Sequence, residues 1–358
     1  VEETRARAKE NADKASLFFD EGAAGTYLND IGPTQARDMA AALGIVLREA
    51  RQQNAVELPV VIVVGDGRPL VPELVAAVAE GLRWSGCHVV DIGQASAPAT
   101  AFAVKNLETD GGILVGNPGY EPQIVGLKFW GAQGMPLSTD QIAPSLDDVR
   151  RVYESRPARP CRKFGSLRRL QIEDAYLATL ADHYHALRPL RVVLDCGCRP
   201  MVEYLRRLTG ALPCEILNYR AGESSCSSTQ GQLVSPVACD RYEQSEPQQP
   251  VAGDWANRTA LQYAVRKNGA HLAVSVDGNG ETCTVFDERG RTIEAQRLAE
   301  LIGRHVEGQI DDGDGRLAYA NAGVPLPDAL RTLTLLLEIL SQSDRPLSSV
   351  LDESRAGG

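Results

Sequence analysis

The chain of 358 residues carries a net charge of −10, with 43% hydrophobic and 23% charged residues. Its length suffices for two or three domains, and its acidic balance argues against nucleic acid or an anionic membrane surface as a partner. No apolar run approaches the roughly 18–20 residues that span a bilayer, and the charged N-terminus is no secretory signal, so we expect a cytoplasmic protein.

Strand-like and helix-like segments alternate along the first part of the chain. Apolar runs predict buried strands at 59–64, 87–93 and 111–116, and the segments between them predict helices at 70–86 and 98–107. This β-α-β-α-β order predicts an α/β fold with a largely parallel sheet covered on both faces. The Pro- and Arg-rich segment 154–166 that follows predicts a linker.

A second unit of the same kind is predicted beyond this linker. Its expected helices and strands alternate at 172–186, 190–197, 201–209, 213–219, 255–268 and 270–276, with a long polar loop at 220–254. Turn residues at Asp287–Gly290 predict a hairpin over 284–293. The remaining predictions are a helix at 295–306, an acidic loop at 307–316, a helix at 326–342 and a loose tail at 351–358.

Eight cysteines are spread along the chain, including the C-x-C pair Cys196 and Cys198. Zinc modules usually pair their cysteines at C-x2-C spacing, which does not occur in this sequence. We therefore expect reduced and mostly structural thiols rather than a zinc site.

One stretch combines the apolar pattern of a buried strand with residues typical of a loop. Residues 111–130 read GGILVGNPGYEPQIVGLKFW, an apolar run followed by Gly, Asn and Pro and then by Gly126 and Lys128. A loop that leaves a strand end and returns to a lysine suits phosphate chemistry. Between Gly116 and Lys128, however, there is no Ser, Thr, Cys, His or Asp that could act as a nucleophile.

Several such stretches, in order, resemble the α-D-phosphohexomutases, the family of phosphomannomutase and phosphoglucomutase. They are VIVVGDGRPLVPELVAAVAEGLRWSGCHVVDIG, DGGILVGNPGYEPQIVGLK, VVLDCG and GAHLAVSVDGNGETCTVFDERGRTI, within about 18–293, and the resemblance reappears at 325–350. It implies α/β/α sandwich domains with mixed, largely parallel sheets. The implied division is an extension at 1–17, domain I at 18–158, domain II at 159–283 and a shortened domain III at 284–358, with domain IV absent.

The resemblance also implies a chemistry. Members of this family move a phosphoryl group between two hydroxyls of a hexose phosphate, using a phosphoserine, a magnesium ion on an Asp-Gly-Asp-Gly-Asp-Arg loop, a sugar-reading loop and a phosphate clamp. Phosphoryl transfer needs a donor group, a cation that neutralises oxygens and groups that position the substrate.

The phosphoserine loop departs from the family pattern. The serine position is Pro118, which has no hydroxyl to carry a phosphoryl group, and the next position is Gly119. Lys128 matches the lysine that assists transfer, and with Arg68 it is the candidate substrate-binding residue. Lys128 can equally be read as a salt-bridged scaffold lysine. Arg68 belongs to a matching Asp-Gly-Arg at a strand end, where its expected role is to pin the loop.

The other matched sites have also changed. The metal loop keeps Asp277 but has Asn279, Glu281 and Thr282 where the family has two aspartates and the arginine. Because one carboxylate and the phosphoserine ligand are lost, we expect magnesium binding to be weak or absent. In the first domain, Ala24 stands at the position of another family arginine.

Two further segments look like functional loops but are assigned to the surface. The segment 222–227 is similar to the sugar-reading loop, yet it precedes the metal loop instead of following it. The segment 312–316 is similar to the metal loop, yet it lacks the third aspartate and follows no apolar strand. The five histidines are scattered and no G-x-S-x-G elbow occurs, which argues against an unrelated hydrolase.

The changed positions favour a catalytically inactive member of the family, a pseudoenzyme with a binding, regulatory or assembly role. One alternative is a divergent phosphomannomutase or phosphoglucomutase, an isomerase on hexose phosphates that uses other residues. A further alternative is a purely structural module. A sugar phosphate is the expected ligand of the first two, and the family's habits imply a homodimer through the first domain.

Overall fold

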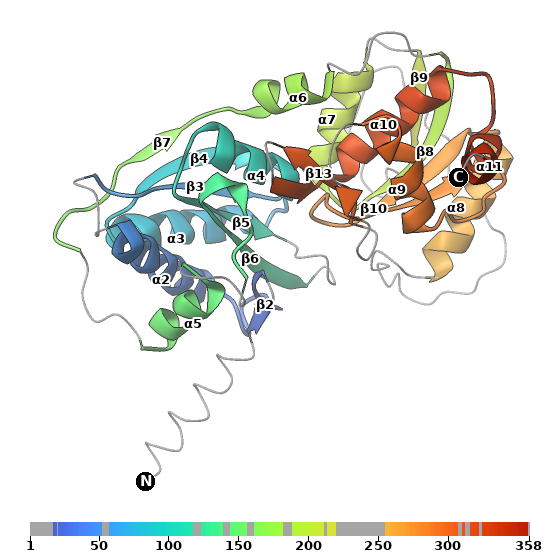
Figure 1. Cartoon of the computed structure of the whole chain (residues 1–358). Helices are drawn as coiled ribbons and strands as arrows, with labels where there is room; N and C mark the ends of the chain where they lie inside the picture. The colour runs from blue at the N-terminus through green and yellow to red at the C-terminus, as the bar shows by residue number, and fades with distance from the viewer. Residues whose placement is uncertain are drawn as a thin grey trace, which may run out of the picture. The chain divides into compact units, whose positions relative to one another are not determined.

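A computed structural model describes most of the chain in two compact units, Val1–Tyr176 and Leu177–Gly358 (Figure 1). The described residues are 17–19, 21–51, 57–116, 123–138, 144–155, 161–181, 188–210, 213–219, 255–306, 310–311, 316–321 and 324–356. Each unit is treated by itself below. The mixed α/β class predicted from the alternating pattern is confirmed, whereas the four-part domain division stays a prediction.

The described part of the first unit is built on a seven-stranded sheet with the order β1-β2-β6-β5-β3-β4-β7. The strands are β1 (Phe18–Phe19), β2 (Gly22–Thr26), β3 (Val60–Gly65), β4 (His88–Gln94), β5 (Gly111–Gly116), β6 (Ile124–Gly131) and β7 (Leu167–Arg169). Strands β5, β3, β4 and β7 run parallel, while β6 and β2 run antiparallel to their neighbours. The sheet is therefore mixed, with a parallel centre.

Helices cover both faces of this sheet, as the predicted β-α-β order requires (Figure 1). Helices α2 (Pro33–Arg51), α3 (Val71–Trp84) and α5 (Leu146–Ser155) share one core with β3, β5 and β6. Helix α4 (Ala97–Asn106) lies on the other face, where Val104 and Thr100 approach Gly112 of β5. The sequence patterns predicted none of α2, α5 and β6, although they identified the neighbouring elements.

The position of β6 corrects the interpretation of the first candidate loop. Gly126 and Lys128 were taken as the returning end of a loop, but both lie inside β6, paired with Gly116 and Leu114 of β5. Successive side chains of IVGLKFW point to alternate faces of the sheet, and pairing with a strand on each side holds this segment as β6. The connection from β5 to β6 is thus residues 117–123, of which 117–122, including Pro118 and Gly119, lie outside the described residues.

The second unit contains two smaller sheets among its described residues. The first has the order β11-β10-β8-β9, with β8 (Leu190–Cys196), β9 (Cys214–Asn218) and β10 (Leu272–Val276) parallel and β11 (Cys283–Asp287) antiparallel. Helices α7 (Arg199–Thr209) and α8 (Trp255–Asn268) belong to this part, and α6 (Glu173–Ala181) spans the boundary between the units. The predicted hairpin at 284–293 is confirmed, because the turn at Asp287–Gly290 brings Thr292 back to an antiparallel bridge with Phe286. The other edge of β11 pairs with β10.

The other sheet of this unit was not predicted. It joins β12 (Ile310–Asp311), β13 (Ala318–Asn321) and β14 (Val324–Pro327), and the helices α9 (Ala295–Gly303), α10 (Ala329–Ser341) and α11 (Leu347–Ala356) belong to the same part of the chain. The helix expected from residue 326 begins only after Asp328, whose carboxylate caps α10 by accepting the Arg331 N–H. The tail expected to be loose is helical in α11.

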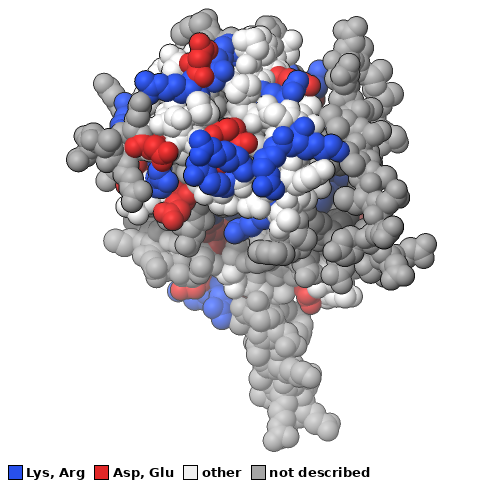
Figure 2. All heavy atoms as spheres, turned by 90° about the vertical axis from the view of Figure 1, so that its right-hand side faces the viewer, with Lys and Arg blue, Asp and Glu red and all other residues white. Residues whose placement is uncertain are grey.

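Several surface charges in the described residues form ion pairs. Figure 2 shows one face on which Lys and Arg side chains gather, with Asp and Glu side chains beside them. Examples of such pairs are Arg206–Glu203, Arg191–Glu215 and Arg291–Asp287, at 2.6, 2.6 and 2.7 Å. Exposed pairs contribute only about 0–1 kcal/mol each. A search of the described helices finds none long and apolar enough to cross a membrane.

Close packing of α2 on α3 depends on Gly81. A Cβ atom at this position would collide with the carbonyl oxygen of Arg37 on α2. We expect Gly81→Ala to lower the free energy of unfolding by about 1–3 kcal/mol, because the two helices must separate. Chemical denaturation measures the change, with Glu80→Ala on the exposed side of α3 as the control. Equal stability of both variants would contradict this packing.

Candidate functional site

The base of the first candidate loop is held by Asp66 and Arg68, which follow β3. The Asp66 carboxylate accepts the Arg68 backbone N–H at 2.9 Å and its Nε at 2.7 Å. Arg68 Nη1 also donates to the carbonyl of Ile124 at 3.0 Å, while the Asp66 N–H donates to the carbonyl of Val115 at 3.1 Å. This pair therefore ties the end of β5 to the start of β6, as expected for residues that pin the loop.

Lys128 lies on the face of β6 that points away from α2 and α3. It is 6% exposed, and its Nζ lies 2.5 Å from Oε2 of Glu21 and 5.4 Å from the ring centroid of Trp130. The strand register brings Glu21 to Lys128, because the next residue after Glu21, Gly22 of β2, is the direct cross-strand partner of Lys128. An almost buried ammonium requires a counter-charge, and Glu21 supplies it. The geometry is that of a salt-bridged lysine.

Ala24 lies on the neighbouring strand at the place where the family would have an arginine. It pairs with Gly126 of β6, two residues along each strand from the Gly22–Lys128 pair. Because side chains alternate along a strand, Ala24 belongs to the face of the sheet that carries Lys128. Its methyl group brings no charge and no hydrogen-bond donor to this face.

The metal-loop positions form the tight turn between β10 and β11, at the carboxyl ends of parallel strands. Asp277 directs its carboxylate into this turn: Oδ1 accepts the backbone N–H groups of Gly280 at 2.7 Å and Glu281 at 3.0 Å, and Oδ2 accepts that of Thr282 at 3.1 Å. Gly280 has φ of +86°, a backbone conformation that favours glycine. Both oxygens of Asp277 thus serve the backbone of their own loop.

Glu281 and Asn279 are buried beside Asp277 and are also engaged. Asn279 Nδ2 donates to Glu281 Oε2 at 3.0 Å, and the Glu281 N–H donates to Asn279 Oδ1 at 3.1 Å. Arg316 donates from Nη2 to the same Oε2 of Glu281 at 2.7 Å. The guanidinium comes from outside the loop, and it is the cation that faces the 3%-exposed Glu281 side chain.

The family normally uses a magnesium ion, so the question is whether the oxygen atoms of this loop could bind one. Magnesium needs near-octahedral oxygen ligands and prefers carboxylates that are not already committed. Asp277 accepts three backbone N–H groups, and Glu281 accepts an amide and a guanidinium. Within the described residues, no group of three or more His, Cys, Asp or Glu side chains could hold a metal. The donor set in this arrangement does not fit the ion.

Burial raises the pKa of Asp277, the acid at the start of this loop. The pKa rises from 3.8 to about 6, and the negative charge of Glu281 acts in the same direction. The three backbone N–H groups act in the opposite direction, because they stabilise the ionised form. The loop therefore holds an acid that is harder to ionise than usual and is turned away from any external ligand.

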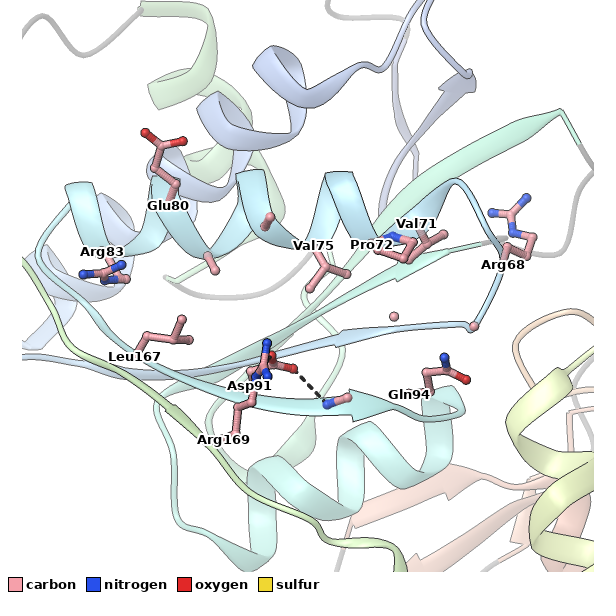
Figure 3. A pocket seen from close by; sticks show the side chains of 15 residues that line it. Arg68, Val71, Pro72, Val75, Glu80, Arg83, Asp91, Gln94, Leu167 and Arg169 are labelled. Atoms are coloured by element: carbon pink, nitrogen blue, oxygen red, sulfur yellow. Dashed lines mark hydrogen bonds and ion pairs between the residues drawn. The ribbon is translucent and has the colours of Figure 1, made fainter.

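A groove of about 390 Å³ lies in the first unit, between α3 and the strands β4 and β7 (Figure 3). Its floor is mostly apolar, with Val75, Ala79 and Leu167 among its lining residues. Two of its charged side chains pair with each other: Arg169 lies 3.2 Å from Asp91, and the Asp91 carboxylate also accepts the Gly93 N–H at 2.9 Å. Its described lining residues include no Ser, Thr, Cys, His or Lys.

The structure also identifies two functional partners that sequence reasoning missed. Glu21 was given no role from the sequence, and Arg316 was assigned to a surface turn. Both act on residues distant in the sequence or on a neighbouring strand, namely Lys128 and Glu281. The remaining residues of that turn, 312–315, and the segment 222–227 lie outside the described residues. No local signal marks such pairings.

The Lys128–Glu21 pair predicts an asymmetric effect of mutation. Glu21→Gln is expected to lower the free energy of unfolding by about 3 kcal/mol, because it removes the negative charge that lies 2.5 Å from the buried ammonium. The control is Asp38→Asn, which breaks the exposed Arg37–Asp38 pair and should cost less than about 1 kcal/mol. Urea denaturation measures both, and equal losses would show that Lys128 does not depend on Glu21.

The raised pKa of Asp277 predicts a pH effect. Protonation is easier in the folded state, so the contribution of this group to stability is full below its unfolded pKa near 3.8 and is lost as pH rises through about 6. Asp277→Asn should therefore flatten the pH dependence of unfolding in this window, by on the order of 1–3 kcal/mol. Urea unfolding at a series of pH values measures it. Parallel profiles of variant and wild type would refute the assignment.

Comparison with known proteins adds to this geometry. Residues 16–151 match the family model described as phosphoglucomutase/phosphomannomutase, alpha/beta/alpha domain I. A phosphoglucosamine mutase of Arthrobacter sp. (strain FB24) is 27% identical over 96% of this chain and 70% of its own length. A phosphomannomutase/phosphoglucomutase of Pseudomonas syringae pv. tomato is 28% identical over 68% of this chain and 47% of its own. The chain thus spans only part of these curated relatives.

Solved structures show the same fold. A phosphoglucomutase/phosphomannomutase family protein from Burkholderia thailandensis matches with a TM-score of 0.72 and 22% identity, over 94% of this chain and 79% of that one. A putative phosphomannomutase from Thermus thermophilus matches with a TM-score of 0.67 and 18% identity, over 95% and 83%. The ordered motifs, the family model of the first domain, the relatives and the fold all support the α-D-phosphohexomutase superfamily.

Proposed function

We propose that this chain is a phosphohexomutase-family protein that has lost mutase turnover and keeps a binding, regulatory or assembly role. The observation that carries the proposal is the commitment of the metal-loop oxygens to protein donors, with Arg316 as the cation beside Glu281. A family mechanism needs those oxygens for a metal, and the sequence offers Pro118 where the phosphoryl carrier would stand.

The state of Lys128 supports the same proposal. In the family this lysine assists transfer by facing a phosphoryl group, which carries negative charge. Here its ammonium lies 2.5 Å from Glu21. An incoming phosphate would have to displace that carboxylate or bind beside it, and the second case adds negative charge to the site. The retained lysine therefore serves the fold more readily than the reaction.

Binding without turnover remains compatible with these features. The groove beside α3, at about 390 Å³, has the size of a small-molecule pocket, which typically measures about 300–1,000 Å³. A sugar phosphate remains the expected ligand, and a homodimer through the first domain remains the expected assembly. A purely structural module would show no saturable binding of a sugar phosphate. A divergent mutase would show turnover.

The proposal predicts a flat trace in a coupled mutase assay. The assay uses glucose 1-phosphate and mannose 1-phosphate with the bisphosphate activator and magnesium, and an active family member is the positive control. Without a phosphorylated residue to relay the group, the two half-reactions have no shared intermediate. Turnover above a heat-killed blank would overturn the proposal in favour of a divergent mutase.

A variant of the first loop tests whether the lost nucleophile is the sole defect. We expect Pro118→Ser to remain inactive, because the metal loop is altered as well and a hydroxyl alone supplies neither the cation nor the substrate clamp. The same coupled assay, run beside the unchanged chain, measures the result. Isomerisation by the variant would show that the rest of the site is competent.

A further inference from the structure

The Glu281 side chain is only 3% exposed, which makes its charge costly unless a cation is near. The amide of Asn279 donates a hydrogen bond but carries no charge. Arg316 Nη2, at 2.7 Å, supplies the positive charge. We propose that Arg316 is a built-in counter-cation: its guanidinium takes over the charge-balancing role of the divalent ion, so that the loop holds its shape without a metal.

The backbone around Arg316 is tied to the same support as the loop. The Ala329 N–H donates to the carbonyl of Gly280 at 3.1 Å, which anchors the loop to the start of α10. The adjacent Asp328 N–H donates to the carbonyl of Leu317 at 3.2 Å, which anchors the residue next to Arg316. One helix start therefore fixes both partners of the ion pair, and the contact is part of the packed fold.

This inference rests on the proposed function in one respect only, because both assume that the loop binds no metal ion. The two can fail separately. A chain that turns over without responding to magnesium would refute the proposed function but leave the counter-cation in place. A chain that binds magnesium at this loop without turnover would refute the counter-cation but leave the proposed function in place. The test therefore uses metal binding and thermal stability rather than activity.

The experiment compares the full-length chain with Arg316→Met and with a matched control, Arg291→Met. The control breaks an ion pair of the same length, 2.7 Å to a 3%-exposed Asp287 side chain, at the far end of β11. Melting temperatures are measured in EDTA and in millimolar magnesium or manganese, and manganese binding is followed by electron paramagnetic resonance. Removal of the cation beside a buried carboxylate should lower the melting temperature by more than about 4 °C.

We expect the unchanged chain to melt at the same temperature in EDTA and in magnesium and to bind no manganese at millimolar levels. Arg316→Met should melt lower and recover at least half of the loss when the cation is added, because the uncovered Glu281 carboxylate can then accept it. Arg291→Met should melt lower without recovery. Manganese binding by the unchanged chain, or an Arg316→Met protein indifferent to cations, would overturn the inference.

If Arg316→Met does not fold in EDTA, the double variant Glu281→Gln, Arg316→Met decides the question, because it removes both charges of the pair. We expect the double variant to fold and to ignore added cations. A double variant that also fails to fold would show that Arg316 acts through packing rather than charge, and the inference would be wrong.

Discussion

Buried charge must be balanced, and in this chain the balance comes from its own side chains at both candidate loops. Glu21 balances Lys128 across two strands of the first sheet, and Arg316 balances Glu281 beside the β10–β11 turn. An uncompensated buried charge costs several kcal/mol, so neither partner can leave without another charge taking its place. The charges of Lys128 and Glu281 are in this way balanced by protein groups.

The same constraint explains how the fold is held when the metal-loop oxygens are committed to protein donors. The strand order, the helices on both faces and the turn after β10 depend on apolar burial and on backbone hydrogen bonds. Asp277 keeps a structural task, because its carboxylate satisfies three N–H groups of the turn. A residue inherited from a metal site can thus be held in place by the needs of the turn alone. Identity at such a position is weak evidence for a reaction.

Local patterns predicted the parallel strands and placed Asp277, Asn279 and Glu281 in one turn, because a buried strand followed by Gly and Asp is a signal within a few residues. They missed β6, whose strand character depends on pairing with β5 and β2. They also extended a helix into β14, a strand rich in proline that pairs with β13 alone among the described strands. Glu21 and Arg316 were missed for the same reason, since tertiary pairing selects them.

The clamp made by Asp66 and Arg68 has a consequence for how the β5–β6 connection can change. These residues hold both ends of the connection from outside it, through Val115 and Ile124. Closing a longer connection between fixed ends costs little, about 0.6 kcal/mol for each doubling of its length. Insertions in this connection should therefore lower the free energy of unfolding only slightly. The connection is a suitable place for grafting foreign peptide sequences onto the scaffold.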